Sequence, residues 1–216
     1  MNTQFPFVAF INTYADAPYH APYKTKDTKE RLKYEKIFSD SREALDSFAD
    51  FVYQLGCDYD MIGFRHQGFL HGSNIKVRDY MWGELRDKSS ISIPESISIF
   101  IEKHDGDSYP TLRISLEVDE KRAPSGTIRI HNDTLVNSSL PKGFNYYLNQ
   151  TSTKKIYSTD SQAEAKSLIN KGTYKKVQIG RIIDIRSLSN TEITNQARTA
   201  IKELVPLYNN LIKKTK

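Results

Sequence analysis

The chain has a single cysteine, Cys57, among 216 residues. This scarcity excludes an intramolecular disulfide and any zinc site built from several cysteines. Long apolar runs are also missing, because stretches such as FVAF and ISIF fall far short of a membrane span. The amino-terminal residues show no apolar region followed by a cleavage site, so no secretory signal is expected. We therefore expect a cytoplasmic protein that is not inserted in a membrane.

The usual signatures of nucleotide, metal and nucleophile chemistry are absent as well. The chain contains no GxxxxGK[ST] loop, no GxGxxG fingerprint, no HExxH and no GxSxG. His66 and His71 lie five residues apart in a glycine-containing stretch, which is poor spacing for two metal ligands on a helix. These absences predict a chain with no cofactor, no metal and no assigned catalytic residue.

Positive charge is present in excess, and it is unevenly distributed. The formal net charge is +5. From residue 151 onward thirteen Lys and Arg face five Asp and Glu, whereas residues 1 to 150 hold eighteen against twenty-one. Such asymmetry favours an anionic partner, and nucleic acid is the commonest one. The alternative is a lysine-rich surface that only keeps the protein in solution.

One stretch, GFRHQGFLHGSNIKVR at residues 63 to 78, has three basic residues, two histidines, three glycines and no carboxylate. Its cationic side chains can bind phosphates and its short polar side chains can read base edges. The glycines allow the backbone to approach a ligand closely. The candidate phosphate contacts are Arg65, Lys76 and Arg78, and the candidate base contacts are Gln67, His71 and Asn74. The alternative is a glycine-rich loop whose charges are solvated.

A weaker segment of the same kind surrounds APSGTIRIHND at residues 123 to 133. It adds Lys121, Arg122, Arg129 and His131 to the candidate DNA contacts.

The periodicity of the chain predicts an α+β fold. Residues 91–103 and 111–120 alternate apolar and polar side chains, as half-buried strands do, and the turn between them predicts an antiparallel pair. Further strands are expected at 5–12, 126–131, 143–150 and 174–185. We expect a mainly antiparallel sheet or pseudobarrel with flanking helices.

Helices are predicted where apolar residues recur at helical spacing between capping residues. One is expected over 40–56 with Asp40 as N-cap, after a shorter polar helix, and another over 160–172. A carboxyl-terminal helix is expected over 188–214, with a Ser189–Glu192 capping box and a kink or break at Pro206. The whole of 1–216 is expected to form a single DNA-binding domain.

Two other functions remain open. An Mg²⁺-dependent nuclease could use Asp107 in the predicted turn with Asp119 and Lys121 after the next strand, since carboxylates hold the metal and a lysine activates water. Exposed charges at strand ends are the simpler explanation of these residues. A protein-interaction module is the third possibility, with the tyrosine- and proline-rich segment 14–23 as its contact surface.

The carboxyl-terminal third resembles the amino-terminal DNA-binding region of McrB-type restriction subunits. The likeness covers residues 90 to 214 and rests on the order FNYYLNQ, a capped helix ending in Lys-Gly, YKKVQIGRIID and ARTAIKELVPLYNNLI. It implies a module that targets a restriction system to double-stranded DNA. Residues 188–214 would then lead to a motor domain that this chain lacks, and through it to a nuclease subunit.

The resemblance also implies how such a module reads DNA. Some members of the family flip a methylated base into an aromatic pocket, for which Tyr80 and Trp82 are available here. The LlaJI-like branch is similar to pseudobarrel domains that grip the major groove with two arms. Basic, glycine-containing segments between short strands fit the second mode better. The expected function is therefore site-specific or modification-specific recognition of duplex DNA.

Overall fold

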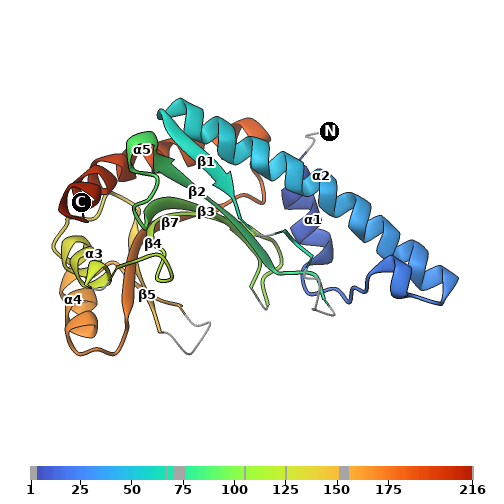
Figure 1. Cartoon of the computed structure of the whole chain (residues 1–216), viewed down its shortest axis with the longest axis horizontal. Coiled ribbons are helices and arrows are strands. Elements are labelled where there is room, and N and C mark those ends of the chain that lie inside the picture. The colour runs from blue at the N-terminus through green and yellow to red at the C-terminus, as the bar shows by residue number, and fades with distance from the viewer. Residues whose placement is uncertain are drawn as a thin grey trace.

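A computed structural model describes residues 4–66, 68–70, 76–104, 106–124, 126–150 and 156–215, which form helices along one side of an arched sheet (Figure 1). The helices are α1 (Pro6–Tyr14), α2 (Thr28–Asp58), α3 (Thr127–Val136), α4 (Gln162–Asn170) and α5 (Asn190–Thr215), with short 3-10 turns η1 (Pro22–Lys24) and η2 (Lys88–Ser90). The strands are β1 (Met61–Arg65), β2 (Tyr80–Asp87), β3 (Glu95–Glu102), β4 (Thr111–Val118), β5 (Asn145–Asn149), β6 (Ile156–Thr159) and β7 (Lys176–Asp184). The α+β prediction is confirmed.

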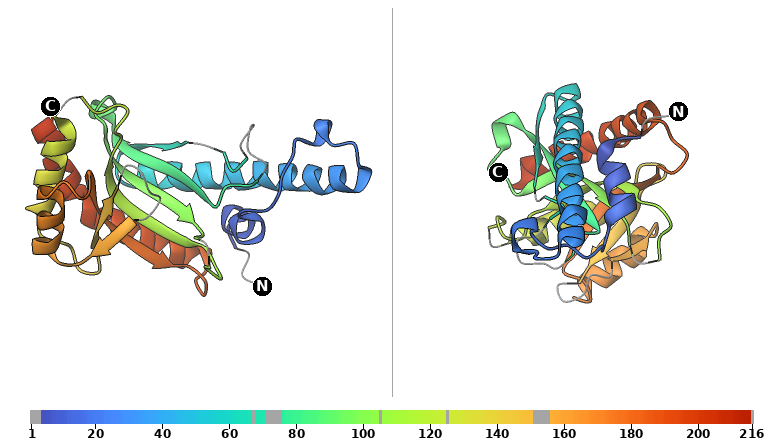
Figure 2. Two further views of the ribbon diagram at one scale, coloured as in Figure 1. Left: turned by 90° about the horizontal axis from the view of Figure 1, so that it is seen from below. Right: turned by 90° about the vertical axis from the view of Figure 1, so that its right-hand side faces the viewer.

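The seven strands form one antiparallel sheet in the order β1-β2-β3-β4-β7-β5-β6. The predicted antiparallel pairing of β3 with β4 is confirmed, with Ser98 opposite Ser115. The sheet is strongly curved, and α2, α3, α4 and α5 lie on its outer, convex side (Figure 1). Seen from below, the strands lie in front of α5, and no described helix covers the inner side of the arch (Figure 2).

The hydrophobic core lies between the outer face of the sheet and the helices. The alternating residues Ile97, Ile99 and Ile101 of β3 are completely buried on this face. α5 packs against it through side chains at helical spacing, including Ile193, Ile201 and Leu204. Burial of apolar surface at roughly 25 cal/mol per Å² makes this layer the main source of stability.

Two segments that were predicted as strands are helices. Residues 5–12 fall largely in α1, which begins with Pro6 in its first turn, a position that suits its fixed φ and missing N–H. Residues 126–131 fall in α3, which follows Gly126 at φ 89°. Phe7 and Phe10 of α1 and Thr127 and His131 of α3 are buried at helical spacing, so tertiary packing overrides the strand preference of the neighbouring β-branched residues.

The helix predicted over 40–56 is part of one longer helix, α2. Asp27, rather than Asp40, is its N-cap and accepts a hydrogen bond from Glu30 N at 2.8 Å. Asp40 lies within the helix and binds Lys36 and the hydroxyl of Tyr14. The first half of α2 extends beyond the sheet together with η1 (Figure 2).

The carboxyl-terminal helix is confirmed, together with its capping box. Ser189 N donates to Glu192 Oε2 at 2.7 Å, and Glu192 N donates to Ser189 Oγ at 3.3 Å. α5 continues through Pro206 as a single helix, so the predicted break does not occur. Among the described residues, no helix is both long and apolar enough to cross a membrane.

Candidate nucleic-acid interface

The inner face of the sheet is polar and aromatic, in contrast to the apolar outer face. We define it by the side chains that alternate with the buried isoleucines and leucines of the neighbouring antiparallel strands β2, β3 and β4. These inner-face residues are Trp82, Glu84, Arg86, Ser96, Ser98, Phe100, Glu102, Arg113, Ser115 and Glu117. Because curvature brings neighbouring strands together on this side, most of the charged members are almost fully buried, although no helix of the described residues lies above them.

An aromatic and cationic row crosses the inner face at right angles to the strands. The ring of His66 stacks on Trp82 with centroids 3.9 Å apart and planes 12° apart. Trp82 in turn is stacked beside Phe100, its cross-strand partner, at 5.8 Å and 11°. The guanidinium of Arg113 lies over Phe100 at 4.0 Å, and the ring of Tyr147 is 5.7 Å from the same guanidinium. Trp82 and Phe100 are half-buried, so part of each ring is accessible.

One buried ion pair anchors this row. Arg113 Nε and Nη2 donate to the two carboxylate oxygens of Glu102 at 2.8 and 3.2 Å, and Arg113 Nη1 donates to Gln178 Oε1 at 3.0 Å. Burial raises the pKa of Glu102, but Arg113 and His104 outweigh burial and lower that pKa to about 2. The hydrogen bond with Glu102 raises the pKa of His104 against the opposing effect of burial. The carboxylate therefore stays charged and holds Arg113 against the rings.

A second buried ion cluster is centred on Glu84. Arg86, which is completely buried, donates to its two oxygens at 2.8 and 2.9 Å, and His66 Nε2 lies 3.0 Å from Oε1. Arg122 Nη1 reaches to 3.9 Å from the same oxygen. Burial raises the pKa of Glu84, whereas its bonds to His66 and Arg86 lower that pKa to about 2 overall. Glu84 thus orients both His66, which stacks on Trp82, and Arg122.

The structure places the predicted phosphate contacts of the 63–78 stretch in different environments. Arg65 is exposed at the end of β1, and strand alternation directs it to the face opposite Trp82. Lys76 is exposed and forms an ion pair with Asp16, so the fold supplies the carboxylate that the stretch itself lacks. Arg78 is largely buried, with its guanidinium 6.0 Å from the ring of Tyr80, and burial lowers its pKa. The predicted base contacts Gln67, His71 and Asn74 lie outside the described residues.

Gly63 of this stretch has a structural use that the sequence did not indicate. A Cβ on Gly63 would lie 2.5 Å from the backbone oxygen of Val52 in α2. A Cβ on Gly83, on the neighbouring strand, would lie 2.7 Å from Phe64 O. Close packing of β1 and β2 against α2, rather than approach to a ligand, accounts for these two positions.

The second predicted segment is divided between the two sides of the sheet. Lys121 and Arg122 are exposed in the turn after β4, and Arg122 donates to Ile91 O at 2.9 Å beside the inner face. Arg129 is exposed on α3, in the helical layer. His131 is completely buried, and its Nε2 lies 3.1 Å from Val177 O. Its ring is part of the core and is not available to DNA, so we do not retain it as a contact.

The residues proposed for a nuclease are not brought together. Asp107 precedes β4 and Asp119 follows it, so eight strand residues at about 3.3 Å each separate them by roughly 25 Å. One metal ion cannot bridge that distance. Within the described ranges, no group of three or more His, Cys, Asp or Glu could hold a metal.

Sequence reasoning noted Trp82 but missed its partners on the inner face. The available signal was the alternation in ESISIFIE and TLRISLEV, where polar and aromatic residues occupy every position that is not buried by the helices. No protein-family model matches the chain, and a search of curated proteins finds no match.

Proposed function

We propose that this protein binds double-stranded DNA and that its inner face contacts a base. The observation that carries the proposal is the half-exposed Trp82–Phe100 stack on a sheet face that none of the described helices covers, flanked by His66 and Arg113. Aromatic rings and guanidinium planes are the groups that proteins use to hold unpaired nucleobases, at about 1–3 kcal/mol per base, so the contact would be made by a base extruded from the duplex. The buried carboxylates fix these groups in advance, which reduces the ordering cost on binding.

Phosphate contacts would come from basic residues at the edge of this face. Lys121 and Arg122 are exposed in the turn after β4, and Arg122 already extends toward Glu84. Arg65 lies on the opposite face and Lys76 is paired with Asp16, so these two cations would add only longer-range attraction. The net charge of +5 and the basic excess after residue 151 are consistent with an anionic partner.

We further propose that the chain is the targeting module of a restriction system. This proposal rests on the resemblance to McrB-type subunits over residues 90 to 214, which in the structure include most of the sheet and α5. On this proposal a motor domain would connect the module to a nuclease subunit, and the module would be site-specific or modification-specific without catalysis of its own. The separation of Asp107 from Asp119 removes the geometric basis for the nuclease alternative.

The first prediction concerns Trp82, the only tryptophan in the chain. Its fluorescence is expected to change on titration with duplex, because an extruded base contacts the accessible part of the indole beside His66. Trp82→Ala should weaken specific binding by roughly 5- to 150-fold, since an aromatic contact with a base contributes about 1–3 kcal/mol. Fluorescence anisotropy with labelled duplex measures both variants, and Trp82→Phe should retain most of the affinity. Unchanged affinity in Trp82→Ala would contradict a role for the inner face.

The second prediction concerns phosphate contacts. The double variant Lys121→Ala, Arg122→Ala is expected to lower duplex affinity for all sequences and to reduce the slope of log K against log salt by about 2, since each neutralised phosphate adds roughly 0.9. Arg129→Ala, Lys202→Ala is the matched control, because it also removes two exposed cations, which lie on α3 and α5 away from the inner face. An equal loss in both variants would indicate diffuse attraction instead of a defined surface.

Specificity is tested with a randomised duplex pool, with and without cytosine methylation, followed by sequencing of the bound fraction. An enriched motif or a dependence on methylation is expected. Binding without enrichment would support DNA binding but would contradict the proposed targeting role.

A further inference from the structure

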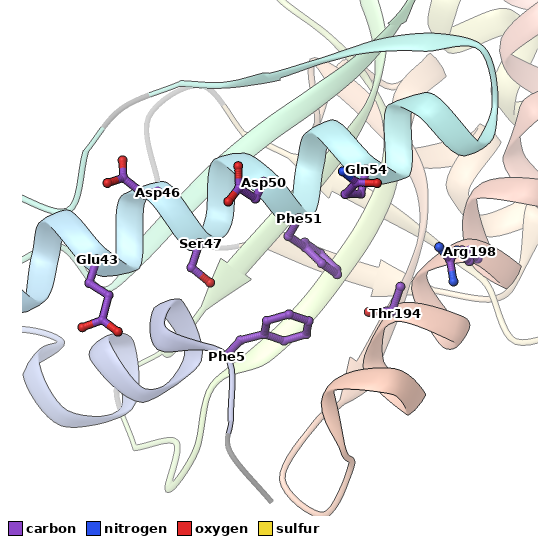
Figure 3. A pocket seen from close by; sticks show the side chains of 9 residues that line it. All are labelled: Phe5, Glu43, Asp46, Ser47, Asp50, Phe51, Gln54, Thr194 and Arg198. Atoms are coloured by element: carbon purple, nitrogen blue, oxygen red, sulfur yellow. The ribbon is translucent and has the colours of Figure 1, made fainter.

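A separate cavity lies between α2 and α5, on the helical side of the molecule (Figure 3). Its volume is about 550 Å³, within the range of roughly 300–1,000 Å³ typical of ligand pockets. Phe5 and Phe51 form its apolar floor, with ring centroids 5.2 Å apart. The remaining lining residues are Glu43, Asp46, Ser47, Asp50, Gln54, Thr194 and Arg198. The cavity is thus apolar at its base and acidic along one side.

The three carboxylates on the α2 side are not neutralised within the described structure. Elsewhere on α2, Arg31 pairs with Glu35 and Lys36 with Asp40, whereas none of the ion pairs or side-chain hydrogen bonds of the described residues involves Glu43, Asp46 or Asp50. All three are exposed. Their spacing of three and four residues makes them neighbours on the helix, where like charges repel and destabilise it.

The basic residue of the cavity does not offset this charge. Arg198 donates from Nε to Asp58 Oδ2 at 2.7 Å, and Asp58 is not one of the residues that line the cavity. The positive charge of Arg198 is therefore already balanced by Asp58. A local excess of negative charge remains beside an apolar floor, on a chain whose net charge is +5.

We propose that this cavity is a docking site for a basic peptide segment of a partner protein, one that carries an aromatic or large aliphatic side chain between lysines or arginines. The apolar side chain would enter between α2 and α5 and contact Phe5 and Phe51, as anchor residues do in peptide grooves. The flanking cations would lie along Glu43, Asp46 and Asp50 and relieve their mutual repulsion. The inner face lies on the other side of the sheet, so DNA and the peptide would occupy separate surfaces.

The test uses the full chain and a fluorescein-labelled, lysine-rich peptide with one central phenylalanine. Anisotropy should show saturable binding, and the same peptide with alanine in the centre should bind about tenfold more weakly because the anchor is lost. Glu43→Lys, Asp50→Lys should also weaken binding by about tenfold, since two favourable exposed charge contacts become repulsive. The control Asp133→Lys, Glu203→Lys makes the same change in net charge at exposed positions outside the cavity and should bind as the wild type does.

Thr194→Trp fills the cavity without altering charge and should abolish peptide binding while leaving duplex affinity unchanged. If thermal unfolding shows that this variant does not fold, Ser47→Trp fills the cavity from α2 instead. Equal affinity for the phenylalanine and alanine peptides, or wild-type affinity in the folded cavity-filling variant, overturns the proposal. Self-association of the wild type that Thr194→Trp abolishes in sedimentation would also overturn it, because the occupant would then be a second copy of the chain. None of these outcomes bears on DNA binding by the inner face.

Discussion

Arg113→Met is expected to lower the free energy of unfolding by about 3–5 kcal/mol at neutral pH, because it leaves the charge of Glu102 buried without its partner. The exposed fraction of Arg113 is only 4%. Its guanidinium donates to both oxygens of Glu102 and to Gln178, and it contacts the face of Phe100. Urea denaturation followed by circular dichroism measures the loss. Arg129→Met, an exposed arginine on α3, should change stability by no more than about 0.5 kcal/mol.

The pair can be separated from simple loss of packing by a double-mutant cycle. Glu102→Gln, Arg113→Met removes both charges, so its destabilisation should be smaller than the sum of the two single variants. In Arg113→Met, Glu102 loses the interaction with Arg113 that lowers its pKa and keeps only that with His104, so its pKa lies above the wild-type value. Because Glu102 is protonated at higher pH in this variant than in the wild type, the difference in stability between the two proteins should narrow as pH falls. Stability within about 1 kcal/mol of wild type would show that Glu102 is solvated.

The parts of the fold that were predictable are those where local pattern and tertiary packing agree. The alternation Ile97, Ile99, Ile101 identified β3 because an antiparallel strand buries every second residue. α5 was identified by its apolar stripe and capping box for the same reason. α1 and α3 were not, since their β-branched and aromatic residues favour strands locally and only burial against other elements makes them helical.

The candidate site was less accessible to sequence reasoning, because it depends on register between distant segments. Trp82, Phe100 and Arg113 become neighbours only when β2, β3 and β4 pair with Trp82 opposite Phe100 and Phe100 opposite Arg113. The ion pair of Lys76 with Asp16 likewise joins residues that are sixty positions apart. Local charge counts could identify exposed cations such as Arg122, but not which carboxylate faces them.

His131 is another residue whose environment depends on distant segments. Its burial predicts a large effect of acid on the stability of the protein. Its ring is fully buried, and burial lowers its pKa to about 3, against the hydrogen bond to Val177 O and with the help of Lys176. In the unfolded chain the pKa is about 6.5. Between these values the unfolded state binds one more proton than the folded state, so folding is disfavoured progressively as pH falls.

The expected result is a loss of about 1.4 kcal/mol of unfolding free energy per pH unit below 6.5 from this one group. His131→Gln keeps an N–H that can donate to Val177 O, but glutamine does not titrate. The variant should therefore lack this pH-dependent loss of unfolding free energy between about pH 6.5 and 5, a range in which most carboxylates are still ionised. Urea denaturation across this range measures the difference between the two proteins. His104 contributes with the opposite sign, because Glu102 raises its pKa, but it is present in both proteins and cancels in the difference. Parallel stability curves for wild type and His131→Gln would mean that His131 titrates normally and that its ring is open to solvent.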